Sequence, residues 1–512
     1  MLTKRDLLLL SFTTGFSVMV VELTASRIIA PILGSSIYTW TSVIGITLLG
    51  TSIGSHIGGN IIDKKNQLRV IANFFLAASA LVLFIPAIAS LSTFLILKVS
   101  TLWLATIIAS LILFFIPAFL LGAIYPMIAK QYFQDIAKIG KNSGTLSASW
   151  STGSILGTFL TGFVFTGYIG SEGTFISISI LLFLCSIWLY VTKNLRLYAT
   201  CFFLLLLVFF FSLKLSHRDN PTTVIHTESN YYDILVADKE LPMLGKVRVL
   251  FLDAGSHNIE SLSDAKFDSY VNFYPVFSVF NEDIRDIAML GGGSLEMSDN
   301  FKNFYPNATV TTAEIDPEVT AIADKYFNAS DYVIENTIAV DGRVFLAGSN
   351  KKYDVIFSDA YNSFISVPWH LATKEFFQLS KSRLNTDGMF AINFISPQTG
   401  NNVFYKSMFA TFSSVYENYY VFVYGNNAQS IENIVLVGIN STVHPSNFQV
   451  KSKLLDVPGG ENLADHLINA SNIKDNNDSI IFTDNYAPID RLMMPIINKY
   501  FTPYISIMNP KT

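Results

Sequence analysis

Cysteine is almost absent from this chain of 512 residues, which contains only Cys185 and Cys201. Both lie within apolar runs, so the sequence offers neither a disulfide framework nor metal-ligand spacing, and we expect no bound metal. Charged residues are also scarce, at 14%, and the net charge of -5 gives no reason to expect a nucleic-acid partner. Hydrophobic residues reach 51%, which is too apolar for a wholly soluble protein.

The apolar residues are concentrated in the first part of the chain. From Leu7 to Leu215, runs of about 20 apolar residues follow one another, which is the length that crosses the hydrocarbon core of a bilayer. We therefore predict a multi-pass α-helical membrane bundle over residues 1–215 with about seven helices: Leu7 to Ala30, Tyr38 to Ile62, Val70 to Leu91, Leu102 to Met127, Leu146 to Tyr168, Thr174 to Val191 and Leu197 to Leu213.

The loops of this bundle differ in their content of Lys and Arg. Most of these residues fall at the amino terminus and in the loops after the second, fourth and sixth helices, which predicts a cytoplasmic amino terminus. An odd number of spans would then place the rest of the chain outside, and an even number would keep it inside. The expected location is the bacterial inner membrane, with the lipid bilayer as a partner.

Small and ionisable residues stand out within the predicted spans. Gly50, Gly54 and Gly58 recur every four residues, which clears one helix face for a neighbouring helix. Glu22 is an ionisable group at bilayer depth, where a functional or inter-helix role is expected. Arg27 lies near a span end, from which its side chain can reach the membrane interface.

The second part of the chain reads as an α/β protein. Short strands with charged turns predict a small β layer over residues 223–285. Over residues 286–505, strands and helices alternate, which is typical of a doubly wound, largely parallel Rossmann-like sheet. The expected strands are Ile287 to Leu290, Thr309 to Ala313, Val333 to Val340, Val355 to Ser358 and Met389 to Phe394, with helices up to Tyr305, over Pro317 to Phe327 and over Leu371 to Leu384.

Ligands of such sheets bind beyond the carboxyl ends of the strands. The first strand runs into Gly291 to Gly293, and the next two end at Glu314 and Asp341. A glycine turn followed by an acid about 20 residues later suits the ribose of a nucleoside. Helix capping is the alternative role for Asp341 and for Asp316. A full G-x-G-x-x-G and a phosphate-binding Lys are missing, which favours S-adenosylmethionine or its decarboxylated form as the ligand.

These residues resemble the spermidine synthases, which are polyamine aminopropyltransferases with a fold of the S-adenosylmethionine-dependent methyltransferase type. The membrane half is similar to the multi-pass domain fused to some bacterial members. The resemblance rests on the segments around Glu22, Arg27 and Trp40, and on Glu228 to Tyr231, Leu252 to Asp253, Phe267 to Tyr270, Leu290 to Gly293, Glu314 to Val319, Asp341 to Arg343, Asp354 to Asp359 and Thr483 to Pro488.

The resemblance implies a role for each matching residue. Gly291 and Gly293 would approach the nucleoside, Glu314 would hold its ribose and Asp341 its adenine amino group. Asp359 would act as the catalytic carboxylate beside the reacting amine. The substrate-binding residues would be Tyr270, Tyr361 and Asn362.

The chain also departs from the family pattern. Ser294 stands where the family has an Asp that holds the amino end of the donor, and Glu296 lies nearby on another helical position. Val271 and Tyr232 replace expected polar residues, and Asn362 replaces the second acid of an Asp-x-x-Asp pair. These departures predict a weakened preference for the decarboxylated donor.

The expected function is that of a membrane-anchored aminopropyltransferase acting in polyamine biosynthesis. Its cosubstrate would be decarboxylated S-adenosylmethionine, its acceptor a polyamine such as putrescine, and no cofactor would be tightly bound. A non-catalytic adenosine-ligand sensor, a transporter-like membrane protein and a methyltransferase using S-adenosylmethionine are the alternatives. A homodimer is compatible with the sequence.

Overall fold

The computed structural model describes residues 2–508, apart from 65–67, 97, 100, 134–137, 191–221, 242–244, 254, 263–268, 361–366, 399–401, 426–430 and 474–477. The chain divides into two compact units. The first comprises Met1–Pro221 together with Thr227–Asp233, and the second comprises Thr222–His226 and Ile234–Pro510.

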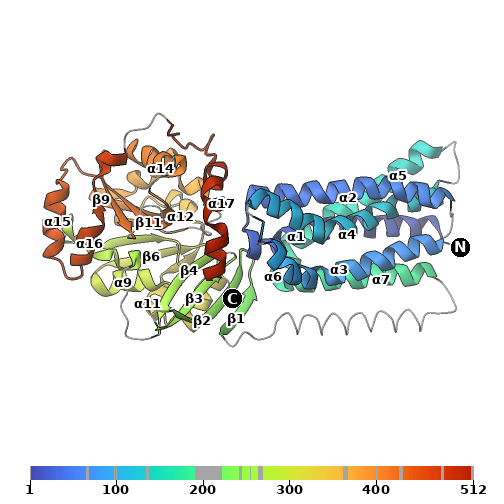
Figure 1. Ribbon diagram of the computed structural model, residues 1–512, viewed down its shortest axis with the longest axis horizontal. Helices are drawn as coiled ribbons and strands as arrows, with labels where there is room; N and C mark the ends of the chain where they lie inside the picture. Colours follow the sequence, from blue (N-terminus) through green and yellow to red (C-terminus); the bar gives the residue numbers. More distant parts are fainter. Residues whose placement is uncertain are drawn as a thin grey trace. The chain divides into compact units, whose positions relative to one another are not determined.

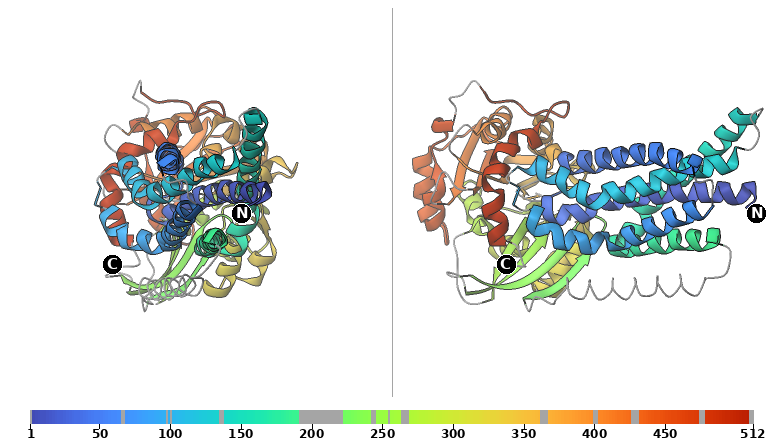
Figure 2. Two further views of the ribbon diagram at one scale, coloured as in Figure 1. Left: turned by 90° about the vertical axis from the view of Figure 1, so that its right-hand side faces the viewer. Right: turned by 45° about the vertical axis from the view of Figure 1, so that its right-hand side comes forward.

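Apart from Thr227–Asp233, the described part of the first unit is helical, and the helices pack side by side as a bundle (Figures 1 and 2). Five of the helices are long and apolar enough to cross a membrane. They correspond to the first four predicted spans and the sixth, while the predicted seventh span, Leu197 to Leu213, lies outside the described residues. The helices are α1 (Lys4–Leu33), α2 (Ile37–Lys64), α3 (Leu68–Ile96), α4 (Leu102–Tyr132), α5 (Ile139–Leu160), α6 (Thr166–Tyr168) and α7 (Gly170–Tyr190).

Glycine allows close helix packing in this unit, as its four-residue spacing predicts. A Cβ at Gly54 of α2 would overlap the backbone carbonyl oxygen of Phe119 in α4. A Cβ at Gly153 of α5 would overlap the carbonyl of Phe12 in α1 in the same way. The predicted span Leu146 to Tyr168 is helical throughout, and it includes a π-helical turn over Thr161–Phe165 between α5 and α6.

Two ionisable residues of α1 have protein partners. The Glu22 carboxylate accepts a hydrogen bond of 3.0 Å from the Thr47 hydroxyl in α2. Arg27, which we expect near the membrane interface, also has partners within the first unit. Its guanidinium donates to the carbonyl oxygens of Asn230 and Ser229, at 2.9 and 2.5 Å. The short segment Thr227–Asp233 is therefore tied to the helical unit.

The second unit contains two sheets. Four strands form the small sheet in the order β1-β2-β3-β4, and β3 is antiparallel to both of its neighbours. These strands are the β layer expected ahead of the main sheet. They span β1 (Thr223–Glu228), β2 (Asp233–Leu241), β3 (Gly245–Leu252) and β4 (Gly255–Ser261).

The main sheet has eight strands in the order β12-β10-β11-β9-β8-β5-β6-β7. The five strands from β9 to β7 in this order are parallel, while β11 is antiparallel to β9 and β10. This topology confirms the predicted Rossmann-like fold. The strands are β5 (Asp286–Leu290), β6 (Thr309–Glu314), β7 (Thr337–Ala339), β8 (Tyr353–Ser358), β9 (Leu384–Ser396), β10 (Asn418–Tyr424), β11 (Glu432–Ile439) and β12 (Leu467–Ile468).

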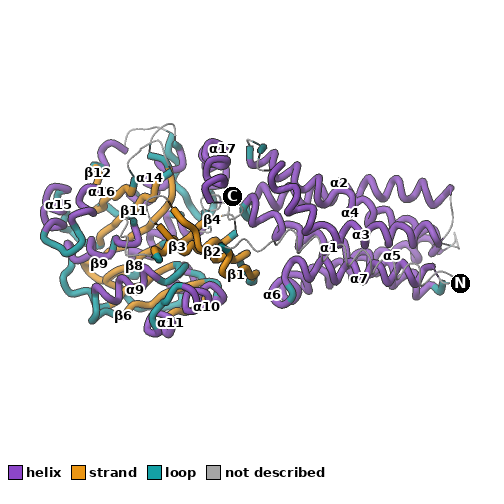
Figure 3. The backbone as a smooth tube through the Cα atoms, turned by 60° about the horizontal axis from the view of Figure 1, so that its bottom comes forward, coloured by secondary structure: helices purple, strands orange, loops and turns teal. Residues whose placement is uncertain are grey.

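Helices cover both faces of the main sheet (Figure 3). On one face Phe273 packs against Phe357 of β8 and Phe422 of β10. On the other face Phe390 of β9 packs against Phe376 and other aromatic residues. The helices are α9 (Glu296–Phe304), α10 (Pro317–Tyr326), α11 (Asp331–Glu335), α12 (Gly342–Ala347), α13 (Lys374–Ser382), α14 (Val403–Ser413), α15 (Asn447–Leu455), α16 (Glu461–His466) and α17 (Ile489–Met508).

One predicted strand is wrong over most of its length. We expected Val333 to Val340 to be a strand, but the structure has the short helix α11 followed by a three-residue strand, β7. Val333 is buried in a small cluster with Leu295 of the glycine turn and Ala323 of α10. Packing against a neighbouring helix thus overrides the β propensity of this apolar run.

Candidate active site

The predicted site residues follow strands that lie side by side. Leu290, the last residue of β5, pairs with Ala313 of β6 and with Ser358 of β8. The three strands are parallel, so the residues that come next, Gly291, Glu314 and Asp359, meet at one edge of the sheet. The register therefore brings together the glycine turn and two of the predicted acids.

The glycine turn approaches the backbone of the neighbouring strand. Gly291 has a φ of 97°, and a Cβ at this position would lie 2.6 Å from the Asp359 carbonyl oxygen. Only glycine fits both the left-handed conformation and the space. Gly293 has a φ of 51°, and a Cβ there would meet nothing within 4 Å, so its backbone is open to a ligand. Helix α9 begins at Glu296, three residues after Gly293.

Glu314 is buried beside this turn. One carboxylate oxygen accepts the N–H groups of Gly292 at 2.8 Å and Gly293 at 3.4 Å. The other oxygen accepts the N–H of Asp316 at 3.0 Å. Burial raises the pKa of Glu314, and these hydrogen bonds oppose the rise. Asp316 itself caps helix α10 through the N–H of Glu318, which was the alternative role of this residue.

Asp341 caps a helix and also contacts a histidine. Its Oδ1 accepts the N–H groups of Arg343 and Val344, both at 2.9 Å, at the start of α12. Its Oδ2 lies 3.0 Å from Nε2 of His370, which donates because an ionised carboxylate only accepts. The hydrogen bond from His370 is the largest cause of the lowered pKa of Asp341. Capping does not use the whole carboxylate, since among the described residues Oδ2 accepts only the His370 bond and can accept a further hydrogen bond.

Asp359 has two side-chain partners from elsewhere in the fold. The Asn393 amide on β9 donates to Oδ1 at 2.8 Å, and the Tyr270 hydroxyl forms a second hydrogen bond. Burial raises the pKa of Asp359 to about 6 despite both bonds. The pKa of Tyr270 is raised by burial and by the nearby Asp359 carboxylate. Oδ1 of Asn393 is buried and has no hydrogen-bond partner among the described residues.

A second polar cluster lies beyond the glycine turn. The Asn258 amide on β4 donates to the Ser294 hydroxyl at 2.5 Å and to the Glu296 carboxylate at 3.0 Å. Burial is the main cause of the raised pKa of Glu296. Burial, followed by the charge of Glu296, raises the pKa of Glu260 to about 7. An acid therefore does lie beside Ser294, although it comes from a different position than in the family pattern.

Sequence reasoning missed Asn258, Glu260, Asn393 and His370. The two β4 residues are separated by one position, so they point to the same face of the strand, and this spacing was an available signal. Two of the predicted substrate-binding residues, Tyr361 and Asn362, lie outside the described residues. Within the described ranges, no group of three or more His, Cys, Asp or Glu side chains could hold a metal ion.

Residues 274–435 match the family described as the spermine/spermidine synthase domain. The second unit carries a spermine/spermidine synthase domain. The matched range includes the glycine turn, Glu314, Asp341 and Asp359, and it excludes Tyr270 and the β4 residues of the second cluster. The sites predicted for the nucleoside and for the reacting amine therefore fall within the synthase domain.

Curated relatives of this domain are aminopropyltransferases from different organisms. The chain is 33% identical over 130 residues to a probable polyamine aminopropyl transferase of Bifidobacterium longum, over 25% of this chain and 28% of that protein. The chain is also 25% identical over 420 residues to polyamine aminopropyltransferase 2 of Aquifex aeolicus, covering 78% of this chain and 80% of that protein. A match over most of both chains includes helical sequence outside the synthase domain.

A solved structure is similar over part of the chain. It is a probable spermidine synthase from Corynebacterium glutamicum, with a TM-score of 0.36 and 18% sequence identity. The similarity covers 43% of this chain and 84% of that structure.

Proposed function

We propose that this protein is a membrane-anchored aminopropyltransferase that uses decarboxylated S-adenosylmethionine and a polyamine such as putrescine. The observation that carries the proposal is the position of Asp359. This acid follows β8, touches the glycine turn through its backbone, and is bonded to Tyr270 and Asn393. A nucleoside on the glycine turn would thus have a carboxylate directly beside it.

The chemistry requires an acid at this place. The amine nitrogen attacks the aminopropyl carbon next to the sulfonium, the C–S bond breaks, and 5′-methylthioadenosine leaves as a neutral molecule. The nitrogen must lose a proton, and a primary amine has a pKa of roughly 10 in water. Asp359, with a pKa of about 6, is ionised at neutral pH and can accept that proton or stabilise the ammonium group. Oδ1 of Asn393, which has no partner among the described residues, offers the amine a second acceptor.

Glu296 supports the decarboxylated form of the donor. This form ends in an ammonium group, while S-adenosylmethionine also carries a carboxylate at that end. Glu296 and Glu260 place two carboxyl groups beyond the glycine turn, close to Asn258 and Ser294. Carboxylates attract the ammonium group and repel the carboxylate of the larger donor. From Ser294 we expected a weakened preference for the decarboxylated donor. Because Glu296 lies beside Ser294, we now propose that this preference is retained.

The five long apolar helices support anchoring in the membrane. If they insert, the protein will remain in the membrane pellet after alkaline carbonate washing and will require detergent for release. Recovery in the carbonate supernatant would contradict the anchoring and would leave the proposed transfer reaction intact. A reporter fused after Thr512 would show which side of the membrane the synthase domain faces.

The test of the reaction uses the full-length protein in detergent, with putrescine and decarboxylated S-adenosylmethionine. Release of 5′-methylthioadenosine together with spermidine is the expected result, and Asp359→Asn should lower kcat by about 10²-fold or more. Asp387→Asn is the matched control, because Asp387 is an exposed residue of β9. Tight nucleoside binding without turnover would favour a sensor. Methyl transfer from S-adenosylmethionine would favour a methyltransferase.

A further inference from the structure

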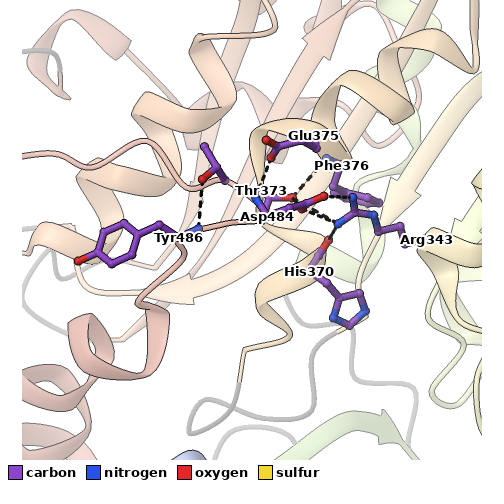
Figure 4. A network of polar contacts seen from close by, with 8 residues as sticks. Arg343, His370, Thr373, Glu375, Phe376, Asp484 and Tyr486 are labelled. Carbon is purple, nitrogen blue, oxygen red and sulfur yellow. Dashed lines mark hydrogen bonds and ion pairs between the residues drawn. The ribbon is translucent and has the colours of Figure 1, made fainter.

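The segment before the last helix reaches back to the nucleoside edge of the sheet. Thr483 and Tyr486 exchange backbone hydrogen bonds of 3.0 Å, which closes a tight turn around Asp484. The Asp484 backbone N–H donates to the Glu375 carboxylate at 2.9 Å, and its Oδ1 accepts the Thr373 hydroxyl at 2.7 Å (Figure 4). The turn is thereby fixed on the start of helix α13.

Asp484 also binds Arg343, which lies 141 positions earlier in the sequence. Nη1 and Nη2 of the guanidinium donate to Oδ1 at 2.8 Å and Oδ2 at 2.5 Å (Figure 4). This is a two-pronged pair, which fixes the plane of the guanidinium as well as its position. The pair raises the pKa of Arg343 and lowers that of Asp484, so both groups remain charged near neutral pH.

Arg343 also connects this pair to Asp341, the acid that we predict to bind the adenine amino group. Its Nη1 donates to the backbone carbonyl of His370 at 3.0 Å, and the His370 ring bonds Oδ2 of Asp341. The Arg343 backbone N–H donates to Oδ1 of the same Asp341. Both oxygens of Asp341 are therefore oriented by groups whose positions depend on Arg343 and its partner.

We propose that Arg343 and Asp484 are positioning residues that set the orientation of Asp341 toward the amino group of the base. This inference rests on the proposed function, in which Asp341 recognises adenine. Asp484 reaches Asp341 only through other residues. The pair is also partly exposed, with side-chain exposures of 24% and 37%, and exposed pairs add little to global stability. Its loss should change base recognition more than it changes folding.

The test measures base preference by calorimetry on the full-length protein in detergent. The two ligands are 5′-methylthioadenosine and 5′-methylthioinosine, which carries an oxygen in place of the amino group. We expect the wild type to bind the adenine ligand more tightly. Asp484→Asn should reduce the ratio of the two dissociation constants about tenfold, which corresponds to the free energy of one charge-assisted hydrogen bond. Arg343→Lys keeps the charge and loses the two-pronged geometry, so it should narrow the preference similarly. In the double variant, the base preference should fall no further than in either single variant.

The chain offers a matched control in a second ion pair. Arg248 donates to both oxygens of Asp238 at 2.7 and 3.0 Å, and the side-chain exposures are 21% and 37%. Asp238→Asn breaks another two-pronged pair of similar exposure on the small sheet and should leave the base preference unchanged. If Asp238→Asn reduced the base preference as much as Asp484→Asn does, the positioning role would be overturned.

The outcomes separate this inference from the function on which it rests. A wild type without any preference for the adenine ligand would overturn the adenine role of Asp341, and the positioning role with it. A wild-type preference that survives both Asp484→Asn and Arg343→Lys would overturn the positioning role alone and leave the aminopropyl transfer standing.

Discussion

The Asn393 amide donates a hydrogen bond of 2.8 Å to the Asp359 carboxylate from the adjacent strand. The bond stabilises the charged form of an acid that burial drives toward the neutral form. The two effects together leave the pKa of Asp359 at about 6, just below neutral pH. A proton acceptor for an ammonium substrate works near this value, because it is ionised yet still basic enough to bind a proton.

Removal of this bond should shift the pH dependence of the reaction. Asp359 must be ionised to act, so kcat/KM, which reports the free enzyme, should rise with pH through about 6 in the wild type. Asn393→Ala deletes the bond that lowers the pKa, and the rising limb should move to higher pH by roughly one unit. The measurement is kcat/KM for 5′-methylthioadenosine release between pH 5 and 9. A variant whose rising limb stays in place would show that the bond does not tune Asp359.

Glu296 should decide which donor the enzyme prefers. Glu296→Gln removes one charge without changing shape, and we expect a rise of about tenfold in KM for decarboxylated S-adenosylmethionine. The KM for the diamine should stay the same. Glu461→Gln is the control, since Glu461 is also the first residue of a helix and is exposed. If Glu296→Gln leaves the donor KM unchanged, the acid cluster does not hold the ammonium end.

Helix packing in the first unit can be tested at two glycines of the same helix. Gly54→Ala would place a methyl group against the Phe119 carbonyl and should destabilise the protein by about 1–3 kcal/mol. A Cβ at Gly45 meets nothing within 4 Å, so Gly45→Ala should be neutral or stabilising by up to about 1 kcal/mol. Thermal unfolding in detergent compares the two variants. Equal midpoints would argue against the close approach of α2 and α4.

The sequence predicted the site well where the end of a strand decides the position of a residue. Glu314 and Asp359 could be predicted together because each lies at the end of a buried strand, and neighbouring parallel strands end at one edge. The polar partners of Asn258 and His370 could not be predicted, because they come from distant segments that meet only in the fold. The short helix α11 was missed for a related reason, since Val333 is apolar in a strand or a helix alike and its packing partners, Leu295 and Ala323, decide between them.

Glu260 gives a prediction about stability rather than activity. Its pKa is about 7 in the folded chain and 4.5 without the fold, because burial and Glu296 disfavour the charged form. The unfolded chain therefore loses this proton first as the pH rises. Folding stability should fall between about pH 4.5 and pH 7 and level off above that range. The size of the fall is reduced by solvent, since Glu260 is only half-buried.

Glu260→Gln removes this titration and keeps the size of the side chain. The variant should match the wild type in unfolding midpoint at pH 5 and exceed it by a few degrees at pH 8, because only the wild type must ionise a confined acid there. Glu240→Gln on β2, at an exposed position, should show no such divergence. If the wild type instead gains stability relative to Glu260→Gln as the pH rises, the pKa of Glu260 is lowered by folding and not raised. A cation, rather than Glu296, would then be the dominant neighbour of Glu260.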